Sequence, residues 1–165
     1  MSNAEAVRAD RYEKFRECLR VEQAAIERAS ERIDAAAVER AVDLLAKCRG
    51  KVIVTGVGKS GVIAEKIAQT MTSTGSSAVF LHPSDAIHGG LGIVGAEDIV
   101  IALSNSGETD ELLAMLPSLT SRKLPVIAIL GNIHSSVAAA SAVVLDASVD
   151  KEARSEERRV GRECR

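Results

Sequence analysis

An apolar, β-branched run that ends in glycines constrains the fold of this chain most. Residues 51–58 read Lys-Val-Ile-Val-Thr-Gly-Val-Gly, and a helix-forming stretch follows directly. A strand that passes through glycines into a helix exposes backbone N–H groups at the helix N-terminus, where anions bind. The arrangement returns at residues 98–109, where an apolar run leads into hydroxyl side chains, a glycine and a second helix-like stretch. We expect the two strand ends to be adjacent and to hold one phosphorylated small molecule between them.

Short apolar runs and helix-like stretches alternate along the rest of the chain. We expect strands at 51–55, 77–81, 98–103, 125–130 and 142–146, helices at 60–73, 108–121 and 134–141, and a short helical turn within 84–94. This alternation predicts an α/β fold with a parallel sheet, right-handed crossovers and ligands at the carboxyl ends of the strands. Because only 2% of the residues are aromatic, the core must consist of Val, Ile, Leu and Ala, as in a sheet with helices on both faces.

Two helices are expected before the first strand. Residues 4–32 predict a long polar helix with a narrow apolar stripe, which we expect to dock on the domain or on a second subunit. A second helix is predicted to start at its N-cap, Asp34, and to end with Gly50 as the C′ glycine. Its predicted buried face consists of Val38, Ala41, Val42, Leu44 and Leu45.

Composition and charge exclude several classes of function. The net charge of −2, with few aromatic residues, gives no reason to expect nucleic acid as a partner. Three cysteines without metal-type spacing predict a reducing, cytoplasmic location, and we predict neither a metal site nor a cofactor. No signal peptide is recognisable at the start, and the weakly apolar stretch 137–145 is too short to span a bilayer, so no membrane partner is expected.

The loop at residues 56–61, Gly-Val-Gly-Lys-Ser-Gly, matches the dinucleotide-binding pattern G-x-G-x-x-G, which is a weak signal by itself. A nucleotide site would place a carboxylate at the end of the next strand, but Asp85 comes only after Pro83. The loop is not a P-loop either, because Ile53 occupies the position of that motif's first glycine. A sugar phosphate without a nucleotide therefore fits better.

The loop at residues 104–109, Ser-Asn-Ser-Gly-Glu-Thr, is the more specific signal. Three hydroxyls, an amide and a glycine before a helix can surround a phosphate with neutral donors. The alternative is simple capping of the following helix by Ser106. Because capping needs one such group and the loop supplies four, the interpretation as a ligand site is favoured.

Several segments together resemble the sugar isomerase (SIS) domain of arabinose-5-phosphate isomerases. They are residues 56–61, His82-Pro83, His88-Gly-Gly-Leu-Gly92, residues 104–109 and Lys151-Glu-Ala153. The resemblance covers about residues 10–153. It implies a five-stranded, flavodoxin-like sheet in three layers, a homotetramer, and interconversion of D-ribulose 5-phosphate and D-arabinose 5-phosphate through an enediol. The product of that reaction feeds Kdo synthesis for lipopolysaccharide.

Isomerisation needs a base, a group that stabilises the oxyanion and a proton carrier for ring opening. The resemblance assigns the base to Glu111, an active-site role to Lys59, and a second base to Glu152, which by itself would be a surface charge. A lysine in the first turn of a helix opposes the helix dipole, so a bound anion would account for Lys59. His88, between a helical turn and glycines, is the candidate proton carrier or a structural histidine. The predicted phosphate ligands are Gly58, Ser60, Ser104, Asn105, Ser106 and Thr109.

The chain departs from the family pattern at two places. Gly90 stands where the family usually has Asp, and after residue 153 the family continues into further helices, a catalytic His and often a pair of CBS domains. We therefore expect an uncovered apolar sheet face and little activity from this chain alone. Residues 1–153 are assigned to the SIS domain, and the charged residues 154–165 to a tail of non-native appearance.

Two other functions remain open from the sequence. One is a non-catalytic sugar-phosphate sensor, which the absence of a recognisable basic helix-turn-helix in residues 1–33 disfavours. The other is a different SIS enzyme, such as a phosphoheptose isomerase or an etherase.

Overall fold

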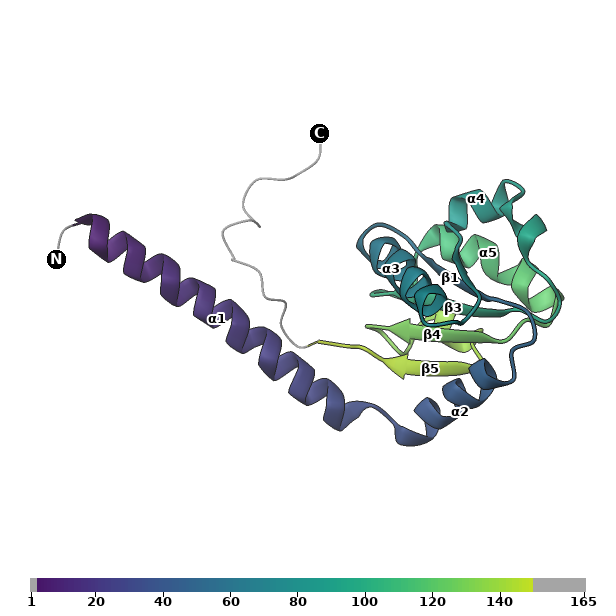
Figure 1. The fold of residues 1–165 in the computed structure, drawn as a ribbon, viewed down its shortest axis with the longest axis horizontal. Coiled ribbons are helices and arrows are strands. Elements are labelled where there is room, and N and C mark those ends of the chain that lie inside the picture. Colours follow the sequence, from purple (N-terminus) through teal and green to yellow (C-terminus); the bar gives the residue numbers. More distant parts are fainter. Residues whose placement is uncertain (1–2, 150–165) are drawn as a thin grey trace. The chain divides into compact units, whose positions relative to one another are not determined.

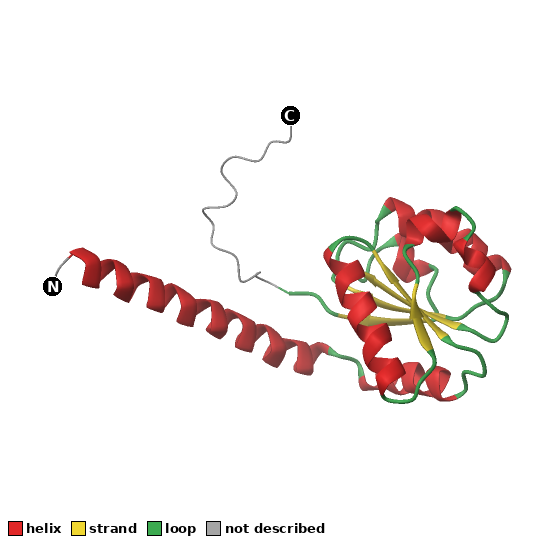
Figure 2. Cartoon of the chain, turned by 45° about the horizontal axis from the view of Figure 1, so that its top comes forward, coloured by secondary structure: helices red, strands yellow, loops and turns green. Residues whose placement is uncertain are grey.

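The computed structural model describes residues 3–149 and shows an open five-stranded sheet with helices on both faces (Figures 1 and 2). The strands are β1 (Val52–Gly56), β2 (Ala78–Phe80), β3 (Ile99–Ser104), β4 (Val126–Leu130) and β5 (Val143–Asp146). All pairs are parallel, in the order β2-β1-β3-β4-β5. The predicted α/β fold with a five-stranded parallel sheet is confirmed.

Alternation along each strand divides the core into two layers. Ile53, Val100 and Ala128 point to the layer formed by α4 (Pro83–Ile87), α5 (Asp110–Ser121) and α6 (Ser136–Ala139). Val54, Ile101 and Ile127 point to the layer formed by α2 (Ala35–Ala46) and α3 (Lys59–Ser73). The buried hydrophobic residues are Val, Ile, Leu and Ala with one Met, as the low aromatic content requires.

The expectation of an uncovered sheet face is wrong for the central strands. Every residue of β1 and β3 is buried, and the half-exposed strand residues are concentrated in the outer strands β2 and β5. The helices described above therefore cover both faces of the sheet centre.

Helix α2 begins as predicted but ends earlier. The Asp34 carboxylate caps it by accepting hydrogen bonds from the amides of Ala36 (3.0 Å) and Ala37 (3.2 Å). The prediction of Gly50 as its C′ residue is wrong, because the helix ends at Ala46 and is capped by Lys47. Gly50 has a different reason to be glycine: a Cβ atom there would overlap the carboxylate of Asp98.

The predicted buried face of α2 is also partly wrong. Val38 and Val42 are exposed, whereas Ala41 is buried as predicted and Ala37, outside the predicted face, is buried in the same layer. Leu44 and Leu45 are half-buried at the edge of the same layer, as part of the predicted face. Alanines let the helix axis approach the strands closely, so the larger valines lie on the outer side.

Helix α1 (Asn3–Arg32) forms a unit separate from the compact unit Ile33–Ser148. Ion pairs one turn apart, such as Lys14–Asp10 at 3.1 Å, run along its surface, and Phe15, Leu19 and Ile26 of its apolar stripe are exposed. No helix in residues 3–149 is long and apolar enough to cross a membrane. The assignment of residues 1–153 to one domain stays a prediction.

Candidate active site

Strand order places the two glycine-containing loops side by side. β1 and β3 are parallel neighbours, with Gly56 opposite Leu103 in the register, so the loops that follow both strands leave the same edge of the sheet. From β1 the chain passes through α3 to β2 on one side, whereas β3 lies on the other side of β1. This reversal of strand order is the place where open α/β sheets bind ligands. The predicted adjacency of the two strand ends is confirmed.

The first loop presents the unpaired N-terminus of α3. Gly58 precedes the helix with a φ of 59°, a backbone conformation that residues other than glycine rarely adopt, and no side chain caps the helix. The first backbone bonds that close the turn are donated by Gly61 to Val57 and by Val62 to Gly58. Within residues 3–149 the amides of Lys59 and Ser60 have no such acceptor, which is the arrangement that receives an anion.

The glycine spacing of this loop serves close packing of α3 on β1. A Cβ atom on Gly61 would lie 2.8 Å from the Gly56 carbonyl oxygen, and one on Gly56 would lie 2.9 Å from the Ser60 carbonyl carbon. The helix therefore starts in direct contact with the strand end. The pattern that resembles a dinucleotide motif is accounted for by this contact without a nucleotide.

The second loop is held by its own hydroxyl groups. Ser104 is 4% exposed, and its Oγ accepts a hydrogen bond from the Gly107 amide at 2.9 Å and lies 3.0 Å from Thr109 Oγ1. Ser106 Oγ accepts a bond from the Glu108 amide at 3.2 Å. Helix α5 starts only at Asp110, with Thr109 as its N-cap residue and no side-chain cap, so capping by Ser106 is excluded.

These contacts give the predicted phosphate ligands different surroundings. The hydroxyl of Ser104 is engaged inside the loop, whereas Thr109 is half-exposed and Ser106 and Asn105 are exposed. Ser60 is half-buried in the first turn of α3. Ser104 thus shapes the loop, whereas the other predicted side chains are partly or fully exposed.

Residues after β4 support the second loop, and the sequence analysis did not identify them. A Cβ atom on Gly107, whose φ is 67°, would overlap Ser135 Oγ. The Glu108 carboxylate accepts a hydrogen bond from the Ser136 amide at 2.6 Å, and the Gly107 carbonyl accepts one from Val137 at 3.2 Å. The polar stretch between β4 and α6, which also ends a strand at this edge of the sheet, was the available signal.

The candidate catalytic residues come from three segments. Lys59 is exposed as the first residue of α3, and Glu111 is half-buried in the first turn of α5. His88 is exposed at the end of α4, which packs against α5. The strand order brings Lys59 and Glu111 to neighbouring helix starts. Glu152 lies outside the described residues.

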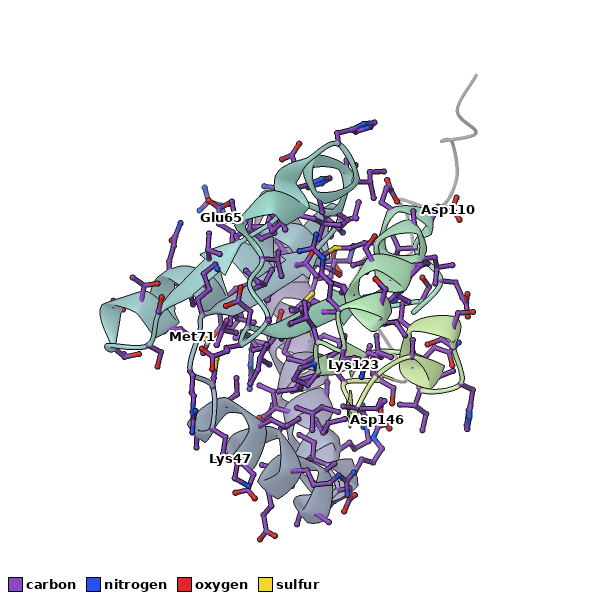
Figure 3. The ribbon with its side chains drawn as sticks, turned by 90° about the vertical axis from the view of Figure 1, so that its right-hand side faces the viewer. Lys47, Glu65, Met71, Asp110, Lys123 and Asp146 are labelled. Carbon is purple, nitrogen blue, oxygen red and sulfur yellow. The ribbon has the colours of Figure 1, made fainter. Side chains whose placement is uncertain are left out.

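Three carboxylates lie at the start of α5 or just before it, and the structure gives them different surroundings. Glu108 precedes the helix and is engaged by the Ser136 amide. Asp110 is exposed at the outer surface (Figure 3). Glu111 is therefore the half-buried carboxylate of this turn without a hydrogen bond to a described residue.

A buried ion pair at the opposite ends of β1 and β3 holds the register that places the loops. Asp98 is 3% exposed and accepts hydrogen bonds from Lys51 Nζ (2.7 Å), the Lys51 amide (2.9 Å) and the Gly95 amide (2.8 Å). Burial alone would raise the pKa of Asp98, but the bonds from Lys51 and Gly95 outweigh it, so the pKa lies below its ordinary value.

His82 caps a helix and contacts an aromatic ring. Its Nδ1 accepts a hydrogen bond from the Ser84 amide at 3.2 Å and thereby caps α4. Its ring also meets Phe80 edge-on, with 6.3 Å between the ring centroids.

Fold and loops together define an open α/β domain with two glycine-containing loops at its topological switch point. The chain belongs to the SIS domain family, whose model matches residues 44–158. This confirms the resemblance inferred from the sequence.

Two bacterial isomerases are among the relatives that the chain resembles in sequence. The chain is 49% identical over 113 residues to the arabinose 5-phosphate isomerase KdsD of Salmonella typhi, and 45% identical over 113 residues to that of Pseudomonas aeruginosa. Each match covers 68% of this chain, and 34% and 35% of the respective relative. The chain thus spans about a third of the length of the curated relatives that it matches.

A solved structure extends the similarity to most of the chain. The c3406 protein of E. coli CFT073, solved in complex with arabinose 5-phosphate, is 36% identical and superposes with a TM-score of 0.82. The superposition covers 93% of this chain and 79% of that one.

Proposed function

We propose that the protein to which this chain belongs interconverts D-ribulose 5-phosphate and D-arabinose 5-phosphate. The observation that carries the proposal is the pair of loops at the neighbouring ends of β1 and β3, in a SIS domain 49% identical to an arabinose 5-phosphate isomerase. The related E. coli CFT073 protein was solved in complex with arabinose 5-phosphate, which supports a sugar phosphate as the ligand.

The phosphate group is assigned to the space between the two loops. The free amides at the start of α3, with Gly58 and Ser60, would receive it from the β1 side. Ser106, Asn105 and Thr109 would donate from the β3 side, where Ser104 and Gly107 fix the loop. Neutral donors and a helix N-terminus bind a dianion without a metal ion as counter-charge.

The remaining candidates divide the chemistry of an aldose–ketose isomerase among them. The reaction moves a proton between C1 and C2 through an enediol. Glu111 would take the proton from one carbon and return it to the other, and Lys59 would stabilise the oxyanion that develops on the neighbouring oxygen. His88 would carry the proton for ring opening, and Glu152 is the second candidate base.

Assembly, location and pathway extend the same proposal. The resemblance to the isomerase family supports a homotetramer and a role of the product in Kdo and lipopolysaccharide synthesis. Within residues 3–149, exposed Cys18 and half-buried Cys48 are free thiols, which agrees with a cytoplasmic location.

A thermal melt of the chain with and without arabinose 5-phosphate tests the ligand. A ligand at 100 times its Kd stabilises the folded state by about 2.7 kcal/mol, which raises Tm by about 5–10 °C for a domain of this size. Inorganic phosphate at the same concentration is the control for an anion effect. A melt that responds equally to both ligands, or to neither, would contradict the sugar-phosphate assignment.

Turnover in the full-length protein tests the chemistry. Glu111→Gln should reduce kcat by a factor of about 10²–10⁴ while preserving the melt response to arabinose 5-phosphate, because it removes a base and leaves the phosphate site. Glu39→Gln, an exposed glutamate of α2, is the matched control. Retention of full activity by Glu111→Gln would exclude Glu111 as the base.

A further inference from the structure

The segment that carries His88 is tied together mainly by local turns. It connects α4 to β3 and contains glycines at 89, 90, 92 and 95. Within residues 88–94 its backbone hydrogen bonds run from His88 to Asp85, from Gly92 to Gly89 and from Val94 to Leu91, each spanning three residues, whereas the far end of the segment is tied down by the Gly50 amide, which donates to the Glu97 carbonyl at 3.1 Å. Such turns shape the segment but do not fix its place relative to the rest of the domain.

Arg122 joins this segment to α5. Its Nη1 donates hydrogen bonds to the carbonyl oxygens of Leu91 at 3.1 Å and of Val94 at 3.0 Å, across 31 and 28 residues of sequence. The side chains of Leu91 and Val94 pack on the core layer to which α5 belongs. Apolar packing holds the segment against the layer, whereas directed bonds to two carbonyls also set its orientation.

The position of Arg122 on α5 gives these bonds a further consequence. Helix α5 starts at Asp110, and Arg122 is its C-cap residue. Figure 3 labels Asp110 and also Lys123, which directly follows Arg122. Glu111 lies in the first turn of the same helix. One short helix therefore carries the candidate base at one end and the anchor of the His88 segment at the other.

We propose that Arg122 is a positioning residue that holds the His88 segment in a fixed place relative to Glu111. The placement of the segment is a structural claim of its own, and its importance for ring opening rests on the proposed function. The planar guanidinium holds the two N–H groups of Nη1 in fixed directions toward the two carbonyls, whereas the N–H groups of a lysine ammonium rotate on a flexible stem. Arg122→Lys should therefore retain part of the anchoring and cause a smaller change than Arg122→Gln.

Hydrogen exchange of the backbone amides tests the placement without reference to activity. In Arg122→Gln, peptides that cover residues 88–94 should exchange at least about tenfold faster than in the unmodified chain, as expected for the loss of bonds from a charged donor. Peptides from β1, β3 and β4 should be unchanged, as should the whole pattern in the control Lys123→Gln. Unchanged exchange at 88–94 in Arg122→Gln would overturn the proposal.

Kinetics of the full-length protein test the consequence for catalysis. Arg122→Gln should lower kcat for arabinose 5-phosphate about tenfold with less than a twofold change in KM, because neither phosphate loop contacts Arg122; Lys123→Gln should leave both constants unchanged. Equal kcat in Arg122→Gln and the unmodified protein, despite faster exchange, would overturn the positioning role and reduce Arg122 to a structural contact. A complete lack of isomerase activity in the unmodified protein would instead overturn the proposed function, and exchange alone would then decide the placement.

Discussion

Substitution of Gly107 by alanine should damage the second loop for two separable reasons. Gly107 has a φ of 67°, which costs an alanine about 1–2 kcal/mol. Its new Cβ would also overlap Ser135 Oγ, lie 2.5 Å from Ser135 Cβ and lie 3.3 Å from the Asn132 carbonyl oxygen. Because Ser135 is 8% exposed and its Oγ accepts a hydrogen bond from the Ala138 amide, it cannot simply rotate into solvent.

The two costs add to a substantial part of the stability of such a domain. Overpacking of a buried site costs about 1–3 kcal/mol, so Gly107→Ala should lower the free energy of unfolding by about 2–5 kcal/mol. At roughly 2–4 °C of Tm per kcal/mol, the melting temperature should fall by about 4–20 °C. The loop should also lose affinity for arabinose 5-phosphate, since Gly107 donates its amide to Ser104 within the candidate site.

Urea denaturation with two comparison variants separates strain from collision. Gly75 also has a positive φ, 95°, but a Cβ there meets no atom within 4 Å, so Gly75→Ala should cost about 1 kcal/mol through backbone strain alone. Ser135→Gly removes the two nearest atoms that the new Cβ would meet and leaves the Asn132 carbonyl oxygen at 3.3 Å. In a double-mutant cycle, Gly107→Ala and Ser135→Gly should show a favourable coupling of about 1–3 kcal/mol.

The reasoning is refuted if Gly107→Ala costs no more than Gly75→Ala and the double-mutant cycle shows no coupling. In that case the loop would move freely away from Ser135, and the contact with the residues after β4 would not hold the candidate site in shape.

Three further predictions concern the ion pair and the ligand loop. Asp98→Asn should lower the free energy of unfolding by about 2 kcal/mol at pH 7. Because the folded pKa of Asp98 lies below its unfolded value, the stabilisation by its carboxylate is present above about pH 4 and is lost as pH falls through the folded pKa. Urea melts of the two proteins should therefore converge in acid. Gly50→Ala should cost a similar amount and be non-additive with Asp98→Asn in the same melts, since its Cβ displaces that carboxylate. Thr109→Val should weaken arabinose 5-phosphate binding about tenfold by titration calorimetry, whereas Thr120→Val, an exposed control in α5, should not.

The arrangement of the sheet was predictable because its signals are local. Apolar β-branched runs a few residues long cannot be amphipathic helices, and their alternation with helix-like stretches allows few topologies. The end of α2 was not predictable, because the residue that explains Gly50 is distant in sequence. Gly50 after a helical pattern indicates a C′ glycine, yet here it is required by the Asp98 carboxylate, 48 residues later in the sequence.

The buried face of α2 shows a second limit of sequence patterns. Large apolar side chains indicate a buried face, but Val38 and Val42 are exposed, and Ala37 and Ala41 lie against the strands. The distance between a helix and a sheet decides which of two adjacent apolar stripes is buried, and that distance is a property of the packed layers. When a helix has a stripe of alanines beside a stripe of valines, the sequence therefore does not indicate which stripe faces the sheet.

In the candidate site, too, the residues placed by local sequence were predictable and those placed by distant contacts were not. Residues at or shortly after the end of a strand, such as Ser104 and Ser60, are placed by that strand, so their type and position could be inferred from sequence. Residues that hold those loops in place come from elsewhere: Ser136 is engaged by Glu108 from the β4 side, and Arg122 reaches back 28 and 31 residues. The part of the site that sequence reasoning misses is thus the set of contacts that make a loop rigid. A rigid loop is what distinguishes a preorganised site from a mere collection of suitable side chains.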